Sequence, residues 1–361
     1  MVKSIKIFLI AVFLMFSGNV MFAENHSNEG ADEQPFDALG LIMHHISDSH
    51  YWHIISFEKK DGSVFEMSIP LPVIIFHEGT VHLFLSSGFH HGETVVQEGD
   101  NYFKLYHDKI YITDESGELT FKENGTVANV KPLDFSITKN VASMWMSALI
   151  ILALFIPAAR KYGGKPKVTR GVQSFLEPLI LFVRDDIVIE QVGEEKADRF
   201  MPFLLTVFFF VWINNLIGLV PFFPGGSNVS GNIAFTSILA AFTFFLTTLN
   251  GSKTYWKDIF ATPGVPATVR VILIPIEIVG MFTKPFALMV RLFANITAGH
   301  IVILSLTSLV FILKTVYVSP VSVLLTLFMF MLELLVGLLQ AYIFTLLSAL
   351  FIGMAVHNEE H

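Results

Sequence analysis

The sequence predicts an all-α polytopic membrane protein with two long, strongly tilted C-terminal helices and a small β-rich extracytoplasmic N-terminal domain. Three observations favour this fold class. Of the 361 residues, 53% are hydrophobic and only 15% are charged, whereas soluble domains have about 25% charged residues. Long stretches of the second half contain almost no charge. Acidic residues are concentrated in residues 24–140, which carry 19 acidic and 7 basic side chains.

Residues 1–23 are predicted to form a signal peptide. Lys3 and Lys6 precede an apolar run from Ile7 to Phe16, and small residues lead to Ala23. A positively charged start, a short apolar run and a small-residue end are typical of secretory signal peptides. An uncleaved first membrane helix is the alternative. Both interpretations place residues 24–140 on the far side of the membrane.

Residues 24–140 are predicted to form a soluble, β-rich extracytoplasmic domain. Apolar and polar residues alternate in SVFEMSI, VHLFL, KIYIT and ELTFK (63–69, 81–85, 109–113 and 118–122), and turn residues separate these segments. Ten of the 13 histidines lie in this region, including His44, His45, His90 and His91. A metal site is one hypothesis for them, but no HExxH or other spaced ligand set is present. We therefore favour a solvated domain that binds neither metal nor cofactor.

Composition excludes several other functions. The chain contains no Cys, which excludes disulfide frameworks, thiolate zinc sites and thiol nucleophiles. The net charge of -8 argues against nucleic-acid binding, because that function needs a basic surface.

The remaining residues, 141–361, are predicted to form a membrane domain with five transmembrane helices, at about 141–159, 201–223, 231–250, 271–313 and 319–356. Residues 141–159 and 200–252 contain no charged side chain. The second stretch is long enough for two helices, which PFFPGGSNVSGN separates at 221–232. Between these stretches, SFLEPLILFVRDDIVIEQVG (174–193) has the mixed pattern of an amphipathic helix on the membrane surface.

The last two apolar segments are too long for ordinary spans. As continuous helices, residues 271–313 and 319–356 would be about 65 Å and about 57 Å long, whereas the hydrocarbon core is about 30 Å thick. We therefore expect steep tilts, or a bend such as one at Pro285. Lys and Arg number eight in loop 160–199 and three in loop 253–270, but none occurs in 224–232. This distribution places the C-terminus in the cytoplasm.

Polar side chains recur along the segment 271–313. Glu277, Lys284 and Arg291 are seven residues apart, and Asn295 extends the same helix face. Three alanines flank Arg291 on that face: Ala287, Ala294 and Ala298. Small residues allow a second helix to approach closely, and intramembrane charges usually mark function. Arg291 is therefore predicted to face a partner helix. For Glu277 and Lys284, pairing or capping near the cytoplasmic interface remains an alternative.

A second set of polar groups lies on other faces. His300 is nine residues beyond Arg291 and points the opposite way, whereas Glu333 and Gln340 share one face of the next helix. If the helices are antiparallel, His300 could lie opposite Glu333, and an imidazole–carboxylate pair can exchange protons near neutral pH. Arg291 stays protonated, so its role would be a fixed charge between two proton paths. Gln340 could alternatively make only a helix-packing hydrogen bond.

Several motifs together resemble subunit a of the F-type ATP synthase membrane sector over residues 140–356. They are PIEIVGMFTKPFALMVRLFANITAGHIVI, LLQAYIFTLLSALFIGMA, FLEPLILFVRDDI, ADRFMPFLLTVFFFVWINNLIGLVPF and SGNIAFT. The resemblance implies a non-catalytic proton-channel stator subunit in the bacterial inner membrane. Its implied partners are the c-ring, the b subunits of the peripheral stalk and the F1 sector, and no cofactor is implied. It places the essential arginine of the family at Arg291, and the family's Asn and Gln at Asn295 and Gln340.

This chain departs from the family pattern at two channel positions. The familiar bacterial arrangement has Glu where this chain has His300, and His where it has Glu333. The exchange is reciprocal, so one imidazole and one carboxylate are retained. The acidic residue of the family near the end of the hairpin's first helix is replaced by Gly218. Asn215 and Asn232 match polar hairpin positions and are expected to line the inlet path.

The alternative function is an ion-coupled secondary transporter with an exported solute-binding domain. Such transporters often contain internal repeats with broken helices, but the hairpin at 200–250 is not repeated in the last two helices. The sequence contains no P-loop, so any ATP chemistry must belong to partner subunits.

Overall fold

The computed structural model describes residues 40, 42–43, 46–58, 64–123, 125–162, 171–220, 223–261, 264–313 and 315–357. The signal peptide predicted at residues 1–23, together with His44 and His45, lies outside these residues. The chain divides into two compact units. One comprises Met1–Lys139, Pro221–Gly226 and Gly299–Met331, and the other Asn140–Val220, Ser227–Ala298 and Leu332–His361. The first unit thus combines the β-rich region with segments of the hairpin and of both long helices.

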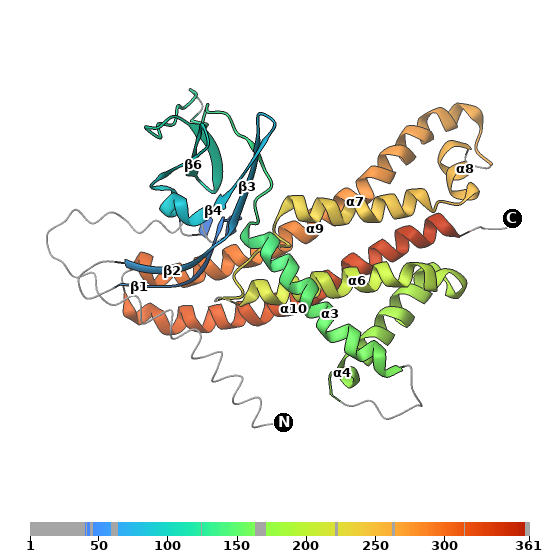
Figure 1. Ribbon diagram of the computed structural model, residues 1–361. Helices are drawn as coiled ribbons and strands as arrows, with labels where there is room; N and C mark the ends of the chain where they lie inside the picture. Colours follow the sequence, from blue (N-terminus) through green and yellow to red (C-terminus); the bar gives the residue numbers. More distant parts are fainter. Residues whose placement is uncertain are drawn as a thin grey trace. The chain divides into compact units, whose positions relative to one another are not determined.

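Three small antiparallel sheets make up the β-rich region (Figure 1). In one, β1 (Tyr51–Glu58) pairs with β2 (Val64–Pro70). In the second, β3 (Pro72–His77) lies between β4 (Thr80–Leu85) and β8 (Leu133–Asp134). In the third, β6 (Asn101–Tyr106) lies between β5 (Val95–Glu98) and β7 (Lys109–Thr113). The predicted strands at 63–69, 81–85 and 109–113 correspond to β2, β4 and β7.

The core of this region comes from alternate residues of these strands. Val73 and Ile75 on β3 are fully buried with Phe103 on β6. The rings of His82 and Phe84, both on β4, lie 5.2 Å and 5.9 Å from that of Phe103. Because successive strand residues face opposite sides, these contacts define the inner face of the β4-β3-β8 sheet.

The strand predicted at 118–122 is wrong. Within that segment only Phe121 forms a bridge, with Val127. The Asn129 side chain accepts a hydrogen bond from the Thr120 amide at 2.8 Å and donates one to the Ile112 carbonyl at 3.0 Å. Asn side chains can compete in this way with backbone ladders. The backbone bonds that remain, from the Lys122 amide to the Thr126 carbonyl and from the Ala128 amide to the Thr120 carbonyl, close a short turn and do not extend into a strand.

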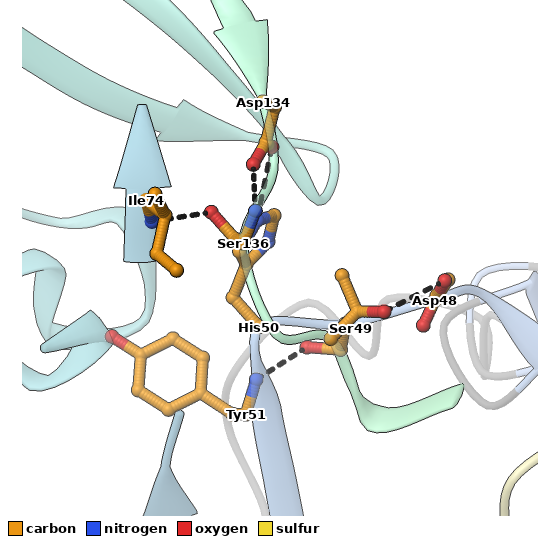
Figure 2. Close-up of polar contacts among 8 residues, drawn as sticks. Asp48, Ser49, His50, Tyr51, Ile74, Asp134 and Ser136 are labelled. Carbon is orange, nitrogen blue, oxygen red and sulfur yellow. Dashed lines mark hydrogen bonds and ion pairs between the residues drawn. The ribbon is translucent and has the colours of Figure 1, made fainter. Parts of the chain in front are cut away.

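Polar contacts tie the chain after β8 to the β-rich region (Figure 2). Asp134 accepts a hydrogen bond from the Ser136 amide at 2.9 Å, and its Oδ2 lies 3.2 Å from Nε2 of His50. Burial by itself would raise the pKa of Asp134, but the hydrogen bonds from His50 and Ser136 outweigh burial and lower it. The Lys139 amide donates to the Ser49 carbonyl at 2.9 Å. The chain therefore stays attached until the first long helix begins.

Helices dominate the rest of the chain. The long ones are α3 (Lys139–Tyr162), α6 (Glu194–Leu219), α7 (Ile233–Leu249), α9 (Ala267–Leu313) and α10 (Ser319–Val356), and the short α8 (Lys253–Ala261) follows α7. Among the described residues, four helices are long and apolar enough to cross a membrane. The pair α7 and α8, bent by 96°, provides a possible fifth span. The prediction of a polytopic helical membrane protein is confirmed at this level.

Two details of the helices differ from a simple hairpin array. The segment predicted as a surface helix consists of α4 (Val172–Phe182), a π-helix at Val183–Ile189 and α5 (Glu190–Val192). Helix α9 continues through both Pro275 and Pro285 without interruption. The bend at Pro285 stays a prediction. The second unit has an aromatic-rich core that includes Phe208, Phe209 and Phe344.

Candidate functional site

One face of α9 carries the polar side chains expected from the sequence, and that face is exposed. Arg291 and Asn295 are both exposed, whereas Leu288, Leu292 and Ile296 on the adjoining face are at most 3% exposed. Helix periodicity explains the division, because buried positions recur every three or four residues. The apolar side of α9 therefore packs within the chain and its polar side faces outward.

The surroundings of Arg291 are small and apolar. Ala287, Ala294 and Ala298 are all exposed on the same side of α9. Over the described part of the chain, no hydrogen bond or ion pair is formed by the Arg291 guanidinium. A cation on an apolar, membrane-length helix is costly without compensation. The compensating group is therefore expected from outside this chain.

Glu277 and Lys284 continue the stripe towards the start of α9, and both are exposed. Lys284 Nζ lies 5.8 Å from the centre of the Phe351 ring on α10. Lys284 also borders a small pocket whose lining includes Thr243, Thr247 and Tyr255. The predicted single polar face from Glu277 to Asn295 thus matches the exposure pattern along α9.

On α10 the corresponding polar groups are buried instead. Glu333 and Gln340 are each 4% exposed. Between them, Gly337 lets α6 approach closely, because Asn215 Nδ2 donates a hydrogen bond to the Gly337 carbonyl at 3.0 Å. A Cβ added at Gly337 would lie 3.2 Å from the Cβ of Asn215. The structure therefore brings Asn215 beside the α10 face that carries Glu333 and Gln340.

Two predicted residues are placed elsewhere. Asn232 is the N-cap of α7, and its side chain accepts a hydrogen bond from the Ala234 amide at 2.9 Å. This contact gives Asn232 a structural role. His300 belongs to the first compact unit and Glu333 to the second. The proposed contact between them stays a prediction.

Buried hydroxyl groups were missed from the sequence. Thr243 on α7 and Ser348 on α10 are buried, and their Oγ atoms are 3.0 Å apart. Thr243 also lines the pocket beside Lys284. Asn214 is a second omission, since it is 1% exposed and donates to the Phe210 carbonyl at 2.7 Å. The available signal was a run of Thr and Ser on otherwise apolar helices, which helix packing also explains.

Taken together, these groups can perform two kinds of chemistry. Arg291 supplies a permanent positive charge on an outward face that accepts a close partner. Glu333, with Gln340 and Asn215 nearby, supplies a protonatable group and amides at helix contacts. No group of three or more His, Asp or Glu side chains within the described residues could hold a metal ion.

Comparisons with known proteins give matches to both parts of the chain. Residues 141–353 match the family described as ATP synthase A chain, and residues 41–135 match one described as a domain of unknown function (DUF8433). A protein of Chloroherpeton thalassium named ATP synthase subunit a is 42% identical, over 77% of this chain and 88% of its own length. One of Anaeromyxobacter sp. with the same name is 37% identical over 93% of this chain and 76% of its own. The second alignment includes most of the N-terminal region.

Proposed function

The chain belongs to the ATP synthase A chain family, and we propose that Arg291 separates two proton half-channels through which it serves a rotating c-ring. The chain is the proton-channel stator subunit a of the F-type ATP synthase membrane sector and is not an enzyme by itself. Moving one charge across 100 mV provides only about 2.3 kcal/mol. Several protons must therefore be collected by a rotor for each ATP.

The observation that carries the proposal is the exposed guanidinium of Arg291 among alanines. A deprotonated carboxylate on a ring helix would supply the missing counter-charge at close range. A protonated carboxyl group would be released from the arginine and could move into lipid. Because Arg291 does not release its proton, protons cannot pass directly from one half-channel to the other.

The buried side of α10 supports a proton path inside the chain. Glu333 and Gln340 lie at helix contacts, and Asn215 reaches the backbone between them. We propose that Glu333 and His300 form the protonatable pair of the inlet, with Gln340 and Asn215 as polar neighbours and Asn295 beside Arg291 on α9. Glu277 and Lys284 would form a secondary polar path together with Asn215 and Asn232.

Orientation and partners complete the proposal. The N-terminal domain lies in the periplasm and the C-terminus in the cytoplasm of a bacterial inner membrane, with residues 1–23 as a signal peptide. Helices α9 and α10 cross the bilayer at a steep tilt, since their 47 and 38 residues exceed the approximately 20 needed for a span. The c-ring, the peripheral-stalk b subunits and F1 are the partners. Labelling of Asp100→Cys from outside and Arg160→Cys from inside would test the orientation.

Mutation of Arg291 gives the direct test of function. We expect Arg291→Ala to abolish ATP-driven proton pumping in inverted vesicles while the complex still purifies intact. Thr283→Ala is the control, because Thr283 is exposed on the same helix and its only hydrogen bond within the described residues is to the Val279 carbonyl, at 2.8 Å. Pumping by the Arg291→Ala enzyme at the control rate would contradict the proposal.

The alternative of an ion-coupled secondary transporter gains no support from the relatives, which are named ATP synthase subunit a. The two functions differ in what the chain purifies with. A stator subunit is recovered with a ring and an ATPase, whereas a transporter is recovered alone or as a homo-oligomer.

A further inference from the structure

The β4-β3-β8 sheet has an outer face that is entirely apolar. On β4, Val81, Leu83 and Leu85 are 66%, 64% and 52% exposed. Strand register places Phe76 beside Val81 and Ile74 beside Leu83. Leu133 on β8 and the following Phe135, 60% and 65% exposed, extend the same surface. We call these residues, with Phe76 and Ile74, the outer apolar face.

An apolar outer face is unusual for a sheet in water. The inner face of the same sheet already supplies the core, through His82 and Phe84 against Phe103. Antiparallel sheets of soluble domains normally place polar residues on the other side. The neighbouring sheet follows that rule, since Tyr102, Lys104 and Tyr106 alternate with the buried Phe103 and Leu105 on β6. Contiguous apolar patches of this kind mark interaction surfaces.

The connection between this sheet and the first membrane helix is short and is hydrogen-bonded to the β-rich region. The amides of Phe135 and Ile137 donate to the carbonyls of Ile74 and Pro72 at 2.9 Å and 3.0 Å. The Lys139 amide donates to Ser49, and α3 begins at Lys139. Lys139 is the fourth residue after Phe135, so their Cα atoms are at most about 14 Å apart. The outer apolar face is therefore held close to where the chain enters the bilayer.

Other contacts within the same unit hold the β-rich region to membrane segments. Trp52 on β1 donates from Nε1 to the Gly225 carbonyl at 3.0 Å, and its ring lies 5.2 Å from that of Phe223. Phe223 and Gly225 belong to the connection between α6 and α7. The unit also includes Gly299–Met331, the connected ends of α9 and α10. Such attachments keep the sheet at the membrane instead of out in solution.

Two kinds of protein partner, a second copy of this chain and its own residues 24–39, fit the outer apolar face less well than lipid does. Residues 24–140 carry 19 acidic and 7 basic side chains, so two copies would repel each other. Residues 24–39 contain five acidic residues and only two large apolar ones, Phe36 and Leu39, too few to cover the face. The outer apolar face has no charged side chain and includes two phenylalanines, Phe76 and Phe135. Such a surface suits the apolar upper part of a lipid leaflet.

We propose that the outer apolar face docks onto the lipid bilayer and buries its side chains among the lipid headgroups and upper acyl chains. The β-rich region is then a membrane-surface anchor that fixes the outer ends of the helices it contacts. This inference rests on the membrane location of the helices and is independent of the proton path.

The absence of Cys from the chain allows a sharp test. Leu83→Cys and, separately, Val81→Cys would carry a nitroxide spin label in the complete ATP synthase, reconstituted into phosphatidylcholine–phosphatidylethanolamine vesicles. The matched control is Asp100→Cys, at an exposed residue before β6 in the same region. Collision rates with oxygen, which concentrates in lipid, and with a water-soluble nickel chelate would be measured at each site.

Lipid docking predicts a ratio of oxygen to nickel accessibility several-fold higher at Leu83 and Val81 than at Asp100. The ratio should not change at high salt, because no charge on the face takes part. Nickel accessibility equal to that of Asp100 would overturn the proposal in favour of a water-exposed face. Low accessibility to both reagents would overturn it in favour of a protein partner.

Discussion

The two longest helices use polar side chains in opposite ways. Helix α9 exposes Glu277, Lys284, Arg291 and Asn295, whereas α10 buries Glu333 and Gln340 at 4% exposure each. Glu277, Lys284 and Arg291 on α9 are seven residues apart, as are Glu333 and Gln340 on α10, and Asn295 follows Arg291 by four residues. The difference is the surface that each helix presents to the rest of the chain. Helix α9 packs through Leu288, Leu292 and Ile296, whereas α10 packs through the side that carries Glu333 and Gln340.

This contrast separates a fixed charge from a titratable one. An outward arginine needs a partner from another subunit, so it can respond to a moving ring carboxylate. If Glu333 carries protons, it is expected to exchange them with groups of its own chain, because packing within the chain buries it. The predictions below test this division, in decreasing order of their expected effect on proton flow.

Removing the fixed charge should have the largest effect. In membranes stripped of F1, Arg291→Ala should increase passive proton leak in addition to abolishing pumping, because the barrier between the half-channels is lost. Proton permeability measured by a pH-sensitive dye checks this expectation. Thr283→Ala should leave the leak unchanged, and a leak-free Arg291→Ala membrane would show that the barrier lies elsewhere.

The titratable pair should have the next largest effect. His300→Ala and Glu333→Ala are each expected to slow pumping about tenfold or more, as removal of a proton-transfer group typically does. If the two groups cooperate, the double variant should be little worse than either single variant. The pumping rates of the parent enzyme, the two single variants and the double variant form a double-mutant cycle. Effects that multiply would show that His300 and Glu333 act independently.

Glycine substitutions probe the packing side of the comparison. Gly337→Val should destabilise the complex by about 1–3 kcal/mol through overpacking, because an added Cβ already lies 3.2 Å from Asn215. Gly280→Val on α9 is the matched control, since within the described residues an added Cβ meets no atom within 4 Å. Thermal unfolding of the solubilised complex measures both. Equal shifts would refute the tight α6–α10 contact.

Lys284 should matter much less than Arg291, although both lie on the exposed stripe. Its ammonium lies 5.8 Å from the Phe351 ring, a contact worth about 0.5–1 kcal/mol at an exposed site. We expect Lys284→Gln to slow pumping only about twofold, which corresponds to about 0.4 kcal/mol in the barrier. Complete loss of pumping would move Lys284 into the essential path.

A histidine–carboxylate pair outside the helices should not affect pumping at all. Asp134 has a lowered pKa beside His50 and Ser136, so its stabilisation is present above the ordinary Asp pKa of about 3.9. Asp134→Asn should lower the stability of residues 46–139 by about 1–3 kcal/mol. The deficit should fade as the pH drops through the lowered pKa. Hydrogen exchange measured against pH checks this, and a deficit independent of pH would contradict it.

The sequence was sufficient for the helices but not for every strand. Residues 319–356 were predicted as one helix and form α10 with those bounds, because a long apolar run in which Glu333 is the only charged side chain leaves few alternatives to a helix in a membrane. The alternation at 118–122 was equally clear, yet the Thr120 amide bonds to the Asn129 side chain and only one bridge, between Phe121 and Val127, forms. That competitor is several residues away and is invisible to a local pattern.

For the site, periodicity determined which side chains share a face, since helix geometry depends only on residue spacing. It therefore placed Glu277, Lys284, Arg291 and Asn295 on one stripe, and Glu333 with Gln340 on another. Only the tertiary structure decided that the first stripe is exposed, that the second is buried, and that Asn215 and Gly337 meet beside it. Exposure depends on what packs against a face, and packing joins residues far apart in the sequence.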